Sequence, residues 1–356
     1  MTAPLDILEG PAGDVPEADR FGEAPHPREM LSLLGHEAAE SEFLEAFRAR
    51  RLHHAWLIAG EEGIGKATLA YRIARFLLAG GRGEGLAVPA SHPVATQIAA
   101  AAHPDLAVIR RAYDPQRKAV TTEIRVDDVR KGLDVFAKTA GAGGYRIAII
   151  DACDDLNASS ANALLKTLEE PPAQSLFLLV THQPRRLLPT IRSRCRMLHL
   201  RPLPEATVAT ITRALPGYAE TGEDIHRRAA ALSEGSVRRA LAVLDPKKLA
   251  FHDSLAGVLA GLPVLDDDRV DALAEETAGR TGEEAFEHFC SLCRRWLSER
   301  LAASDDPRRL LPVAETWQRL ATEAREVDIY NLDRRPLVIG LLNDMARLAR
   351  AASRFG

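Results

Sequence analysis

The stretch GEEGIGKATLA, which begins at Gly60, carries the residue types of a loop that binds phosphate. It follows the pattern GxxxxGK[ST], in which glycines let backbone N–H groups surround the phosphates and the lysine reaches the β and γ oxygens. The last position of the pattern holds Ala67, which cannot coordinate Mg²⁺ as a Ser or Thr hydroxyl would. Thr68 follows, but the next residue of a helix points about 100° away and is a poor substitute. The candidate nucleotide-binding residues of the loop are Gly60, Gly63, Gly65 and Lys66.

An ATPase of this type also needs acidic side chains at a strand end opposite the loop, and RIAIIDACDDL is the candidate. Asp151 supplies the first carboxylate, but Ala152 stands where a glutamate would polarise the attacking water. Asp154 or Asp155 would approach from a different direction, and general-base geometry tolerates little displacement. Because loss of a positioned base costs on the order of 10²–10⁴ in rate, the sequence predicts little or no intrinsic ATP hydrolysis.

Between Pro171 and Pro204 the chain has no Asp, Glu or Lys, and six arginines: Arg185, Arg186, Arg192, Arg194, Arg196 and Arg201. Arginine without local acids indicates a surface that meets phosphates or acidic groups of another molecule. For most of the six, pairing with acids elsewhere in the chain is the preferred interpretation. Arg194 differs, because it stands directly ahead of an apolar strand. An arginine that reaches a neighbouring subunit's γ-phosphate can contribute about 10³–10⁵ in rate.

The elements that would position these residues follow from short apolar runs. HAWLIAG, the glycine-rich loop and ATLAYRIARFLLAG read as strand, loop and helix, which is the context that a phosphate-binding loop needs. DLAVIRR, RIAIID, SLFLLVT and RMLHL read as further strands, and prolines end the helix SSANALLKTLEE. Near-continuous apolar strands that alternate with helices predict a parallel sheet covered on both faces. The first 200 residues are therefore expected to form an α/β nucleotide-binding domain.

The composition shifts at both ends of this domain. Residues 1–25 hold six acids, one base and four prolines, and are predicted to be a disordered acidic tail. Beyond Pro204 the strand signals fade and amphipathic helices follow. The predicted domains are residues 26–202, a small helical domain at 203–247 and a larger helical domain at 248–356.

Bulk properties limit the function less than the motifs do. At 356 residues the chain is long enough for two or three domains. Its 46 Lys and Arg against 50 Asp and Glu neither require nor exclude a nucleic-acid partner. The chain has no run of about 18 apolar residues and no signal-peptide layout, so a cytoplasmic protein with reduced cysteines and no membrane partner is expected.

The motifs together resemble a known family. SANALLKTLEEPP followed by SLFLLVTHQPRRLLPTIRSRC resembles the AAA+ subunits of bacterial clamp loaders, and the similarity runs from about Pro27 to Leu241. The resemblance implies an AAA+ base, a helical lid and a helical collar that oligomerises. It also implies that Arg194 is an arginine finger acting in trans, that Thr181 is a sensor at a strand end and that Arg238 is a sensor arginine of the lid. For Thr181 and Arg238, ordinary packing stays an alternative.

The departures from the family pattern favour a particular role. Motor subunits of clamp loaders keep the hydroxyl and the acidic pair that are missing at Ala67 and Ala152, so the resemblance favours a non-hydrolysing, stator-like subunit. Its expected partners are motor subunits, a delta subunit, the sliding clamp and primed DNA. Many relatives carry a four-cysteine zinc module, but residues 79–110 contain no cysteine, so no zinc is expected. Binding of ATP or ADP is left open. The alternatives are an active motor ATPase that uses Thr68 and Asp154, and a DNA-binding AAA+ protein outside replication.

Overall fold

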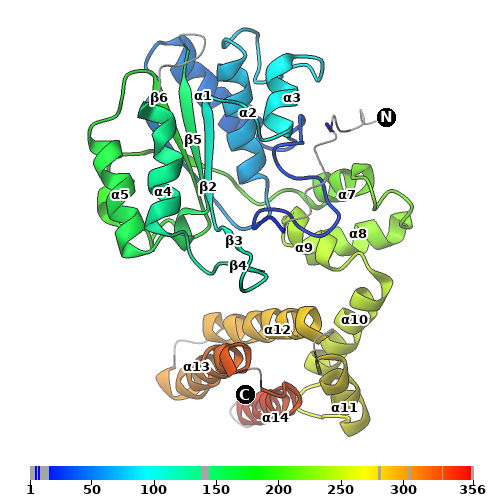
Figure 1. The fold of residues 1–356 in the computed structure, drawn as a ribbon. Coiled ribbons are helices and arrows are strands. Elements are labelled where there is room, and N and C mark those ends of the chain that lie inside the picture. The colour runs from blue at the N-terminus through cyan, green and yellow to red at the C-terminus, as the bar shows by residue number, and fades with distance from the viewer. Residues whose placement is uncertain are drawn as a thin grey trace. The chain divides into compact units, whose positions relative to one another are not determined.

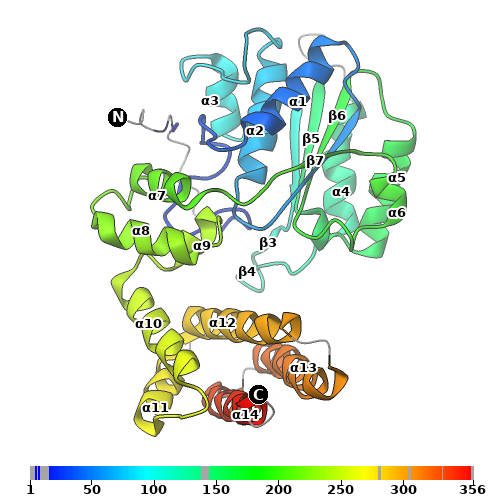
Figure 2. The same cartoon turned by 180° about the vertical axis from the view of Figure 1, so that it is seen from behind.

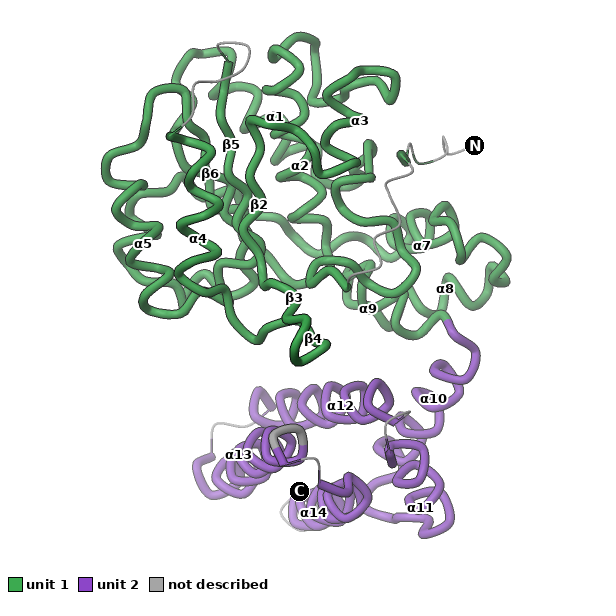
Figure 3. Tube along the Cα trace, in the orientation of Figure 1, with its two compact units in different colours: residues 1–244 green, residues 245–356 purple. Residues whose placement is uncertain are grey.

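The chain forms two compact units, residues 1–244 and 245–356 (Figure 3). The computed structural model describes residues 5, 7–8, 16–137, 144–279, 282–303, 306–330 and 332–353. Each unit has its own hydrophobic core, so each is described by itself.

A five-stranded sheet organises the first unit, in the order β2-β5-β6-β1-β7 with every pairing parallel. The strands are β1 (Ala55–Ala59), β2 (Leu106–Arg110), β5 (Arg146–Asp151), β6 (Ser175–Thr181) and β7 (Arg196–His199). In this register Ala59 pairs with Thr181 and Arg110 pairs with Asp151, so the carboxyl ends of four strands meet at one edge. The predicted parallel sheet is confirmed, and its carboxyl edge is where open α/β sheets bind ligands.

The strand side chains alternate between two buried cores, because successive residues of a strand point to opposite faces. Trp56 and Ile58 pack into one core, and Ala55 and Leu57 pack into the other. Helices α1 (Glu37–Arg48), α2 (Lys66–Leu78) and α3 (Pro93–Ala99) cover the first face. Helices α4 (Val126–Leu133) and α5 (Ala158–Glu169) cover the second (Figures 1 and 2). Both faces are buried, as the continuous apolar runs predict.

Shorter elements connect these layers at the edges of the sheet. They are the hairpin of β3 (Tyr113–Asp114) and β4 (Ala119–Val120), the 3₁₀ turns η1 (Asp134–Ala137) and η2 (Cys153–Asp155), and the helix α6 (Pro189–Arg192).

Three short helices follow the sheet within the first unit: α7 (Glu205–Ala214), α8 (Glu223–Leu232) and α9 (Val237–Ala242). They share a small core that includes Val208, Ala229, Ala230 and Leu241. We call these three helices the lid. Met30, from the segment ahead of α1, packs into the same core and so joins the lid to the sheet domain.

The second unit is entirely helical in the residues described. It comprises α10 (Pro246–Gly261), α11 (Asp267–Glu276), α12 (Glu283–Ala302), α13 (Pro307–Tyr330) and α14 (Arg335–Ser353). Cys290 and Cys293 are buried as free thiols in its core, beside Phe289 and Leu297. The prediction that the chain becomes helical after the sheet domain is confirmed.

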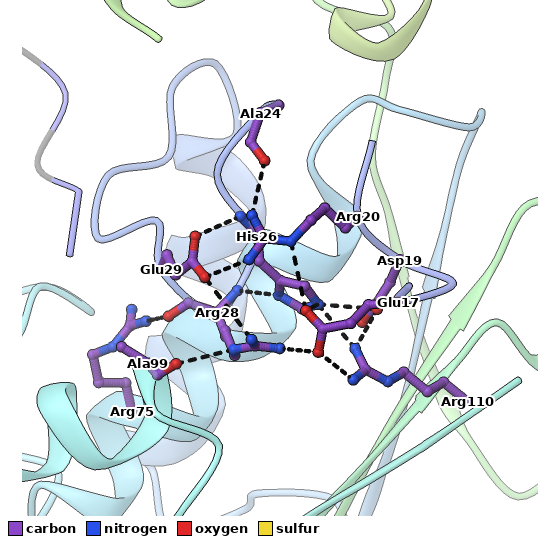
Figure 4. A network of polar contacts seen from close by, with 10 residues as sticks. All are labelled: Glu17, Asp19, Arg20, Ala24, His26, Arg28, Glu29, Arg75, Ala99 and Arg110. Atoms are coloured by element: carbon purple, nitrogen blue, oxygen red, sulfur yellow. Dashed lines mark hydrogen bonds and ion pairs between the residues drawn. The ribbon is translucent and has the colours of Figure 1, made fainter. Parts of the chain in front are cut away.

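The segment 16–25 corrects the prediction of a disordered tail (Figure 4). Glu17 accepts hydrogen bonds from Arg28 at 2.6 Å and from Arg110 at 2.5 Å. Asp19 pairs with Arg110 and lies 2.9 Å from His26 Nε2. The prediction failed because the acids of this segment are unbalanced only locally, and their basic partners come later in the chain. Residues 1–4, 6 and 9–15 of the predicted tail lie outside the described residues.

This network generates a prediction about acid stability. Burial opposes the charge of Glu17, but hydrogen bonds from Arg28 and Arg110 lower its pKa from 4.5 to about 2. A lowered carboxyl pKa stabilises the fold above 4.5, and that contribution is lost as the pH falls toward 2. Glu17→Gln should lower the free energy of unfolding by about 1–2 kcal/mol at neutral pH, and the loss should shrink as the pH falls below 4.5.

Chemical denaturation of the full chain at several pH values measures this. Glu123→Gln, at an exposed position, is the control and should change little. An equal loss for Glu17→Gln at every pH would contradict the ionic role of Glu17.

Candidate nucleotide-binding site

The glycine-rich loop joins β1 to α2 at the carboxyl edge of the sheet. Gly63 and Gly65 have φ values of +76° and +105°, which side-chain-bearing residues rarely adopt. A Cβ at Gly63 would lie 2.3 Å from the Cβ of Arg238, and one at Gly65 would lie 3.0 Å from Leu33 Cδ1. The predicted strand-loop-helix arrangement is confirmed, and the loop's glycines are required by its close contacts.

Lys66 begins α2, and its side chain turns back into the loop. Its residue is only 3% exposed, and Nζ donates to the carbonyl of Gly60 at 2.8 Å and also to that of Glu61. Burial lowers the pKa of Lys66 to about 8, while the charge of Asp151 opposes that shift. The amino group that would meet a phosphate is therefore held by carbonyls of its own loop.

Asp151 ends β5 on the same edge of the sheet. Burial raises its pKa to about 7, the charge of Asp19 adds to the rise, and Lys66 opposes it. Ala152 follows and is nearly buried, so the position of the missing glutamate offers no carboxylate. Lys66 and Asp151 thus have pKa values shifted toward each other, as expected for an acid and a base that share a site with little water.

Asp154, a candidate substitute base, is held by the end of β6. Its carboxylate accepts hydrogen bonds from Thr181 Oγ1 at 2.9 Å, from the backbone N–H of His182 at 2.7 Å and from that of Gln183 at 2.9 Å. Asp155, the other candidate, pairs with Arg111 at 3.1 Å. Both carboxylates therefore have structural partners, and the hydroxyl of the fully buried Thr181 is used to hold Asp154.

The lid binds directly to the glycine-rich loop. Ser236, the N-cap of α9, donates from Oγ to the carbonyl of Glu62 at 2.7 Å. The backbone N–H of Val237 donates to the carbonyl of Gly63 at 2.9 Å. Arg238 lies with Nε 3.4 Å from Glu62 Oε1 and with its guanidinium 4.8 Å from the ring centre of Phe21. The lid arginine is thus placed over the loop, where its charge is opposed by Glu62.

These elements enclose a cavity of about 240 Å³. Of the predicted residues, its lining includes Gly63, Gly65, Lys66, Asp151 and Arg238. Gly60 and Thr181 are not among the lining residues, because Gly60 packs against the backbone of Leu200 and Thr181 faces Asp154.

Apolar side chains form the rest of the wall, among them Leu33, Leu34, Ile211, Leu215 and Leu241. Ala67 and Thr68 both line the cavity, although Thr68 was expected to turn away from it. One polar end next to an apolar wall is the arrangement that suits a nucleotide, with phosphates at the loop and the base against the lid.

Arg194 lies outside the cavity, in the short segment between α6 and β7. Its guanidinium contacts Glu169 of α5 at 2.8 Å and donates to the carbonyl of Thr190 at 3.0 Å. The side chain is 35% exposed, and Arg194 is not among the residues that line the cavity. Glu169, in the last turn of α5, is therefore the ion-pair partner of Arg194.

Sequence reasoning missed the partners that join the site together. Ser236 could have been recognised, since a Ser directly ahead of a helical segment is a typical N-cap. Asp19 and Phe21 carried no such signal, because their contacts depend on residues far along the chain. Within the described parts of the chain, no three His, Cys, Asp or Glu side chains gather as a metal site, and no helix has the length and hydropathy of a membrane span.

Comparison with known proteins gives the family. Residues 35–204 match the family model described as DNA polymerase III, delta subunit. DNA polymerase III subunit delta' of Pseudomonas aeruginosa is 40% identical over 192 residues, which make up 51% of this chain and 53% of that protein. DNA polymerase III subunit tau of Salmonella typhimurium is 32% identical over 268 residues, 73% of this chain and 40% of that protein. The matches therefore span about half or less of these relatives.

A solved structure adds only a likeness of fold. The gamma subunit-related protein of DNA polymerase III from Thermotoga maritima has 18% identity and a TM-score of 0.43, and the match covers 86% of this chain and 99% of that one. The sequence matches place residues 35–204 in the family described as DNA polymerase III, delta subunit, and relate the chain to further DNA polymerase III subunits. Within that family, both the matching model and the Pseudomonas relative are of the delta type.

The contact between loop and lid can be tested at Gly63. Gly63→Ala would place a methyl group against Arg238 and Ser236, whereas Gly80, with φ of +92°, has open space around it. Gly80→Ala should cost only the backbone strain of about 1–2 kcal/mol. Gly63→Ala should cost about 1–3 kcal/mol more, because the lid must move. Chemical denaturation gives both values, and equal losses would contradict the tight contact.

Proposed function

We propose that this chain is a non-hydrolysing, stator-like subunit of a DNA polymerase III clamp loader, and that Arg194 completes the ATP site of an adjacent motor subunit. One observation carries the proposal. The chain's own cavity has Ala67 and Ala152 where a metal-binding hydroxyl and a catalytic glutamate are expected, while Arg194 is 35% exposed and lies outside that cavity. A guanidinium in such a position cannot serve its own loop but is open to a neighbour.

The cavity has the parts for binding a nucleotide but not for cleaving one. Lys66 and the backbone of the glycine-rich loop would hold phosphates, and Asp151 and Arg238 lie at the same cavity. Ala67 offers no metal ligand. Asp154 would have to break three hydrogen bonds before it could accept a proton from water. We therefore assign any ATP or ADP bound here a structural part, with Thr181 and Arg238 as sensor residues.

The ion pair of Arg194 can give way to a stronger partner. Exposed pairs such as Arg194 with Glu169 contribute only about 0–1 kcal/mol, since water solvates both charges when they separate. A triphosphate offers several anionic oxygens to the planar guanidinium and forms stronger, bidentate hydrogen bonds. Glu169 would then hold Arg194 at the subunit surface until a neighbour's nucleotide replaces it.

The family membership supports the proposed partners. The relatives are subunits of DNA polymerase III, so we propose motor subunits, a delta subunit, the sliding clamp and primed DNA as the assembly in which this chain works. Any DNA contact would be to backbone phosphates, for which the exposed Arg185 and Arg186 are suited.

A motor ATPase is the second candidate, because Thr68 lines the cavity and the tau relative matches more of this chain than the delta' relative does. The purified full chain, given Mg-ATP with and without primed DNA, separates the two. We expect no turnover above the trace level of a Lys66→Met control. ATP turnover by the wild-type chain that is abolished in Thr68→Ala or Asp154→Asn would show that the chain is a motor ATPase. It would refute the stator-like role.

The arginine finger is tested in the reconstituted clamp loader. Arg194→Ala should lower ATP turnover at the adjacent site by about 10³-fold or more, since transition-state charge loses its partner. Arg194→Lys should recover little, because an ammonium cannot make the bidentate contact. Arg201→Ala, at an exposed arginine of the same segment, is the matched control. Per-site turnover that is unchanged in Arg194→Ala would contradict the assigned role.

A further inference from the structure

Residues 16–25, which we call the strap, contact both the sheet domain and the lid of the first unit. On the sheet side, Glu17 and Asp19 bind Arg110, the last residue of β2. Glu17 also binds Arg28, whose backbone carbonyl accepts a hydrogen bond from Arg75 of α2 at 2.7 Å (Figure 4). These contacts join the strap to two elements of the sheet domain.

On the lid side, the strap makes apolar and cation–π contacts. The ring of Phe21 lies 4.8 Å from the guanidinium of Arg238, and Ala24 is buried in the core that the lid helices share. The strap glycine Gly22 lies against the hydroxyl of Tyr218, which follows α7. A segment bonded to both parts resists their separation, in addition to the direct bonds between α9 and the glycine-rich loop.

Between these two anchors the strap forms part of the cavity wall. Asp19, Phe21, Ala24 and Pro25 line the cavity together with Lys66. The side chain of Asp19 is 7% exposed, and among the described residues its Oδ2 atom has no hydrogen-bond partner. The strap therefore brings a buried carboxylate to the cavity that holds the phosphate-binding loop.

The size and the acidic side chains of the cavity both oppose a nucleotide. Its volume of about 240 Å³ is below the roughly 300–1,000 Å³ of typical small-molecule sites. Asp19 and Asp151 both line the cavity, where the phosphates of a nucleotide would bring further negative charge. Lys66 meanwhile donates to the carbonyls of its own loop. Phosphate would have to displace these contacts in a space that the strap has narrowed.

We propose that the strap is an intramolecular latch, which ties the lid to the sheet domain over the nucleotide cavity and must be released before a nucleotide can bind. The inference concerns this chain's own cavity and is independent of the role of Arg194. If only a fraction of molecules has an open strap, the apparent affinity for nucleotide falls by that fraction. The strap thereby couples nucleotide binding to the ordering of residues 16–25.

The test is nucleotide binding to the full chain, measured with a fluorescent N-methylanthraniloyl-ADP by anisotropy and stopped flow. Glu17→Gln weakens the strap without altering the lining of the cavity, since Glu17 is not a lining residue. It should raise the affinity and the association rate about tenfold. Asp127→Asn, which removes an exposed acid paired with Arg130, is the matched control and should change neither.

Three outcomes would overturn the latch. They are an affinity for Glu17→Gln within twofold of the wild type, a weaker affinity, or no binding by either protein at millimolar ADP. A second measurement needs no variant and decides the matter if Glu17→Gln does not fold. Backbone hydrogen exchange of residues 16–25 in the wild-type chain should speed up at saturating ADP, and slower exchange would show that the strap closes on the nucleotide instead.

Failure of the latch is distinct from failure of the proposed function. Arg194→Ala should leave ADP binding to the isolated chain unchanged, because Arg194 does not line the cavity. Conversely, Glu17→Gln should leave the contribution of Arg194 to a neighbour's turnover intact.

Discussion

The candidate site depends on the contact between the backbone of Gly63 and the lid. Its carbonyl accepts a hydrogen bond from the N–H of Val237, and its missing Cβ leaves room for Arg238. Together with the hydrogen bond from Ser236 to the carbonyl of Glu62, this contact holds the glycine-rich loop against the lid. The glycine-rich loop and the first turn of α9 are thus hydrogen-bonded to each other, although they lie far apart in sequence.

The charges around this junction are balanced within the chain. Lys66 donates to carbonyls of its own loop, Arg238 lies beside Glu62, and Asp155 pairs with Arg111. Side chains that would engage phosphates and metal in a working ATPase are therefore occupied by neighbours. Burial shifts the pKa values of Lys66 and Asp151 to about 8 and about 7, so part of their charge is lost near neutral pH.

Arg194 presents the opposite situation, because its partner is replaceable. In its ion pair with Glu169 the side chain of Arg194 stays 35% exposed. The free energy of such a pair is small, which allows a more highly charged ligand to take it over. The polar side chains of the cavity are paired within the chain, whereas Arg194 has a partner that it can exchange. This contrast is the physical basis of the proposal that Arg194 acts at the ATP site of a neighbouring subunit.

The sequence by itself determined the features that depend on local pattern. Apolar runs predicted the parallel sheet, and the spacing of glycines and Lys66 predicted the loop. Ala67 and Ala152 led to the prediction of little or no hydrolysis, which stays a prediction. These could be read because strand burial, helix periodicity and loop geometry each involve residues close together in the chain.

Only the tertiary structure decided how the site residues are paired. Thr181 meets Asp154 across 27 residues, Asp19 meets Arg110 across 91, and Ser236 meets Glu62 across 174. No local spacing encodes such pairs, because an acid can be satisfied by any base that the fold brings within reach. For the same reason residues 16–25 looked like an unbalanced tail, whereas the fold places Arg28 and Arg110 beside their acids and makes the segment a wall of the cavity.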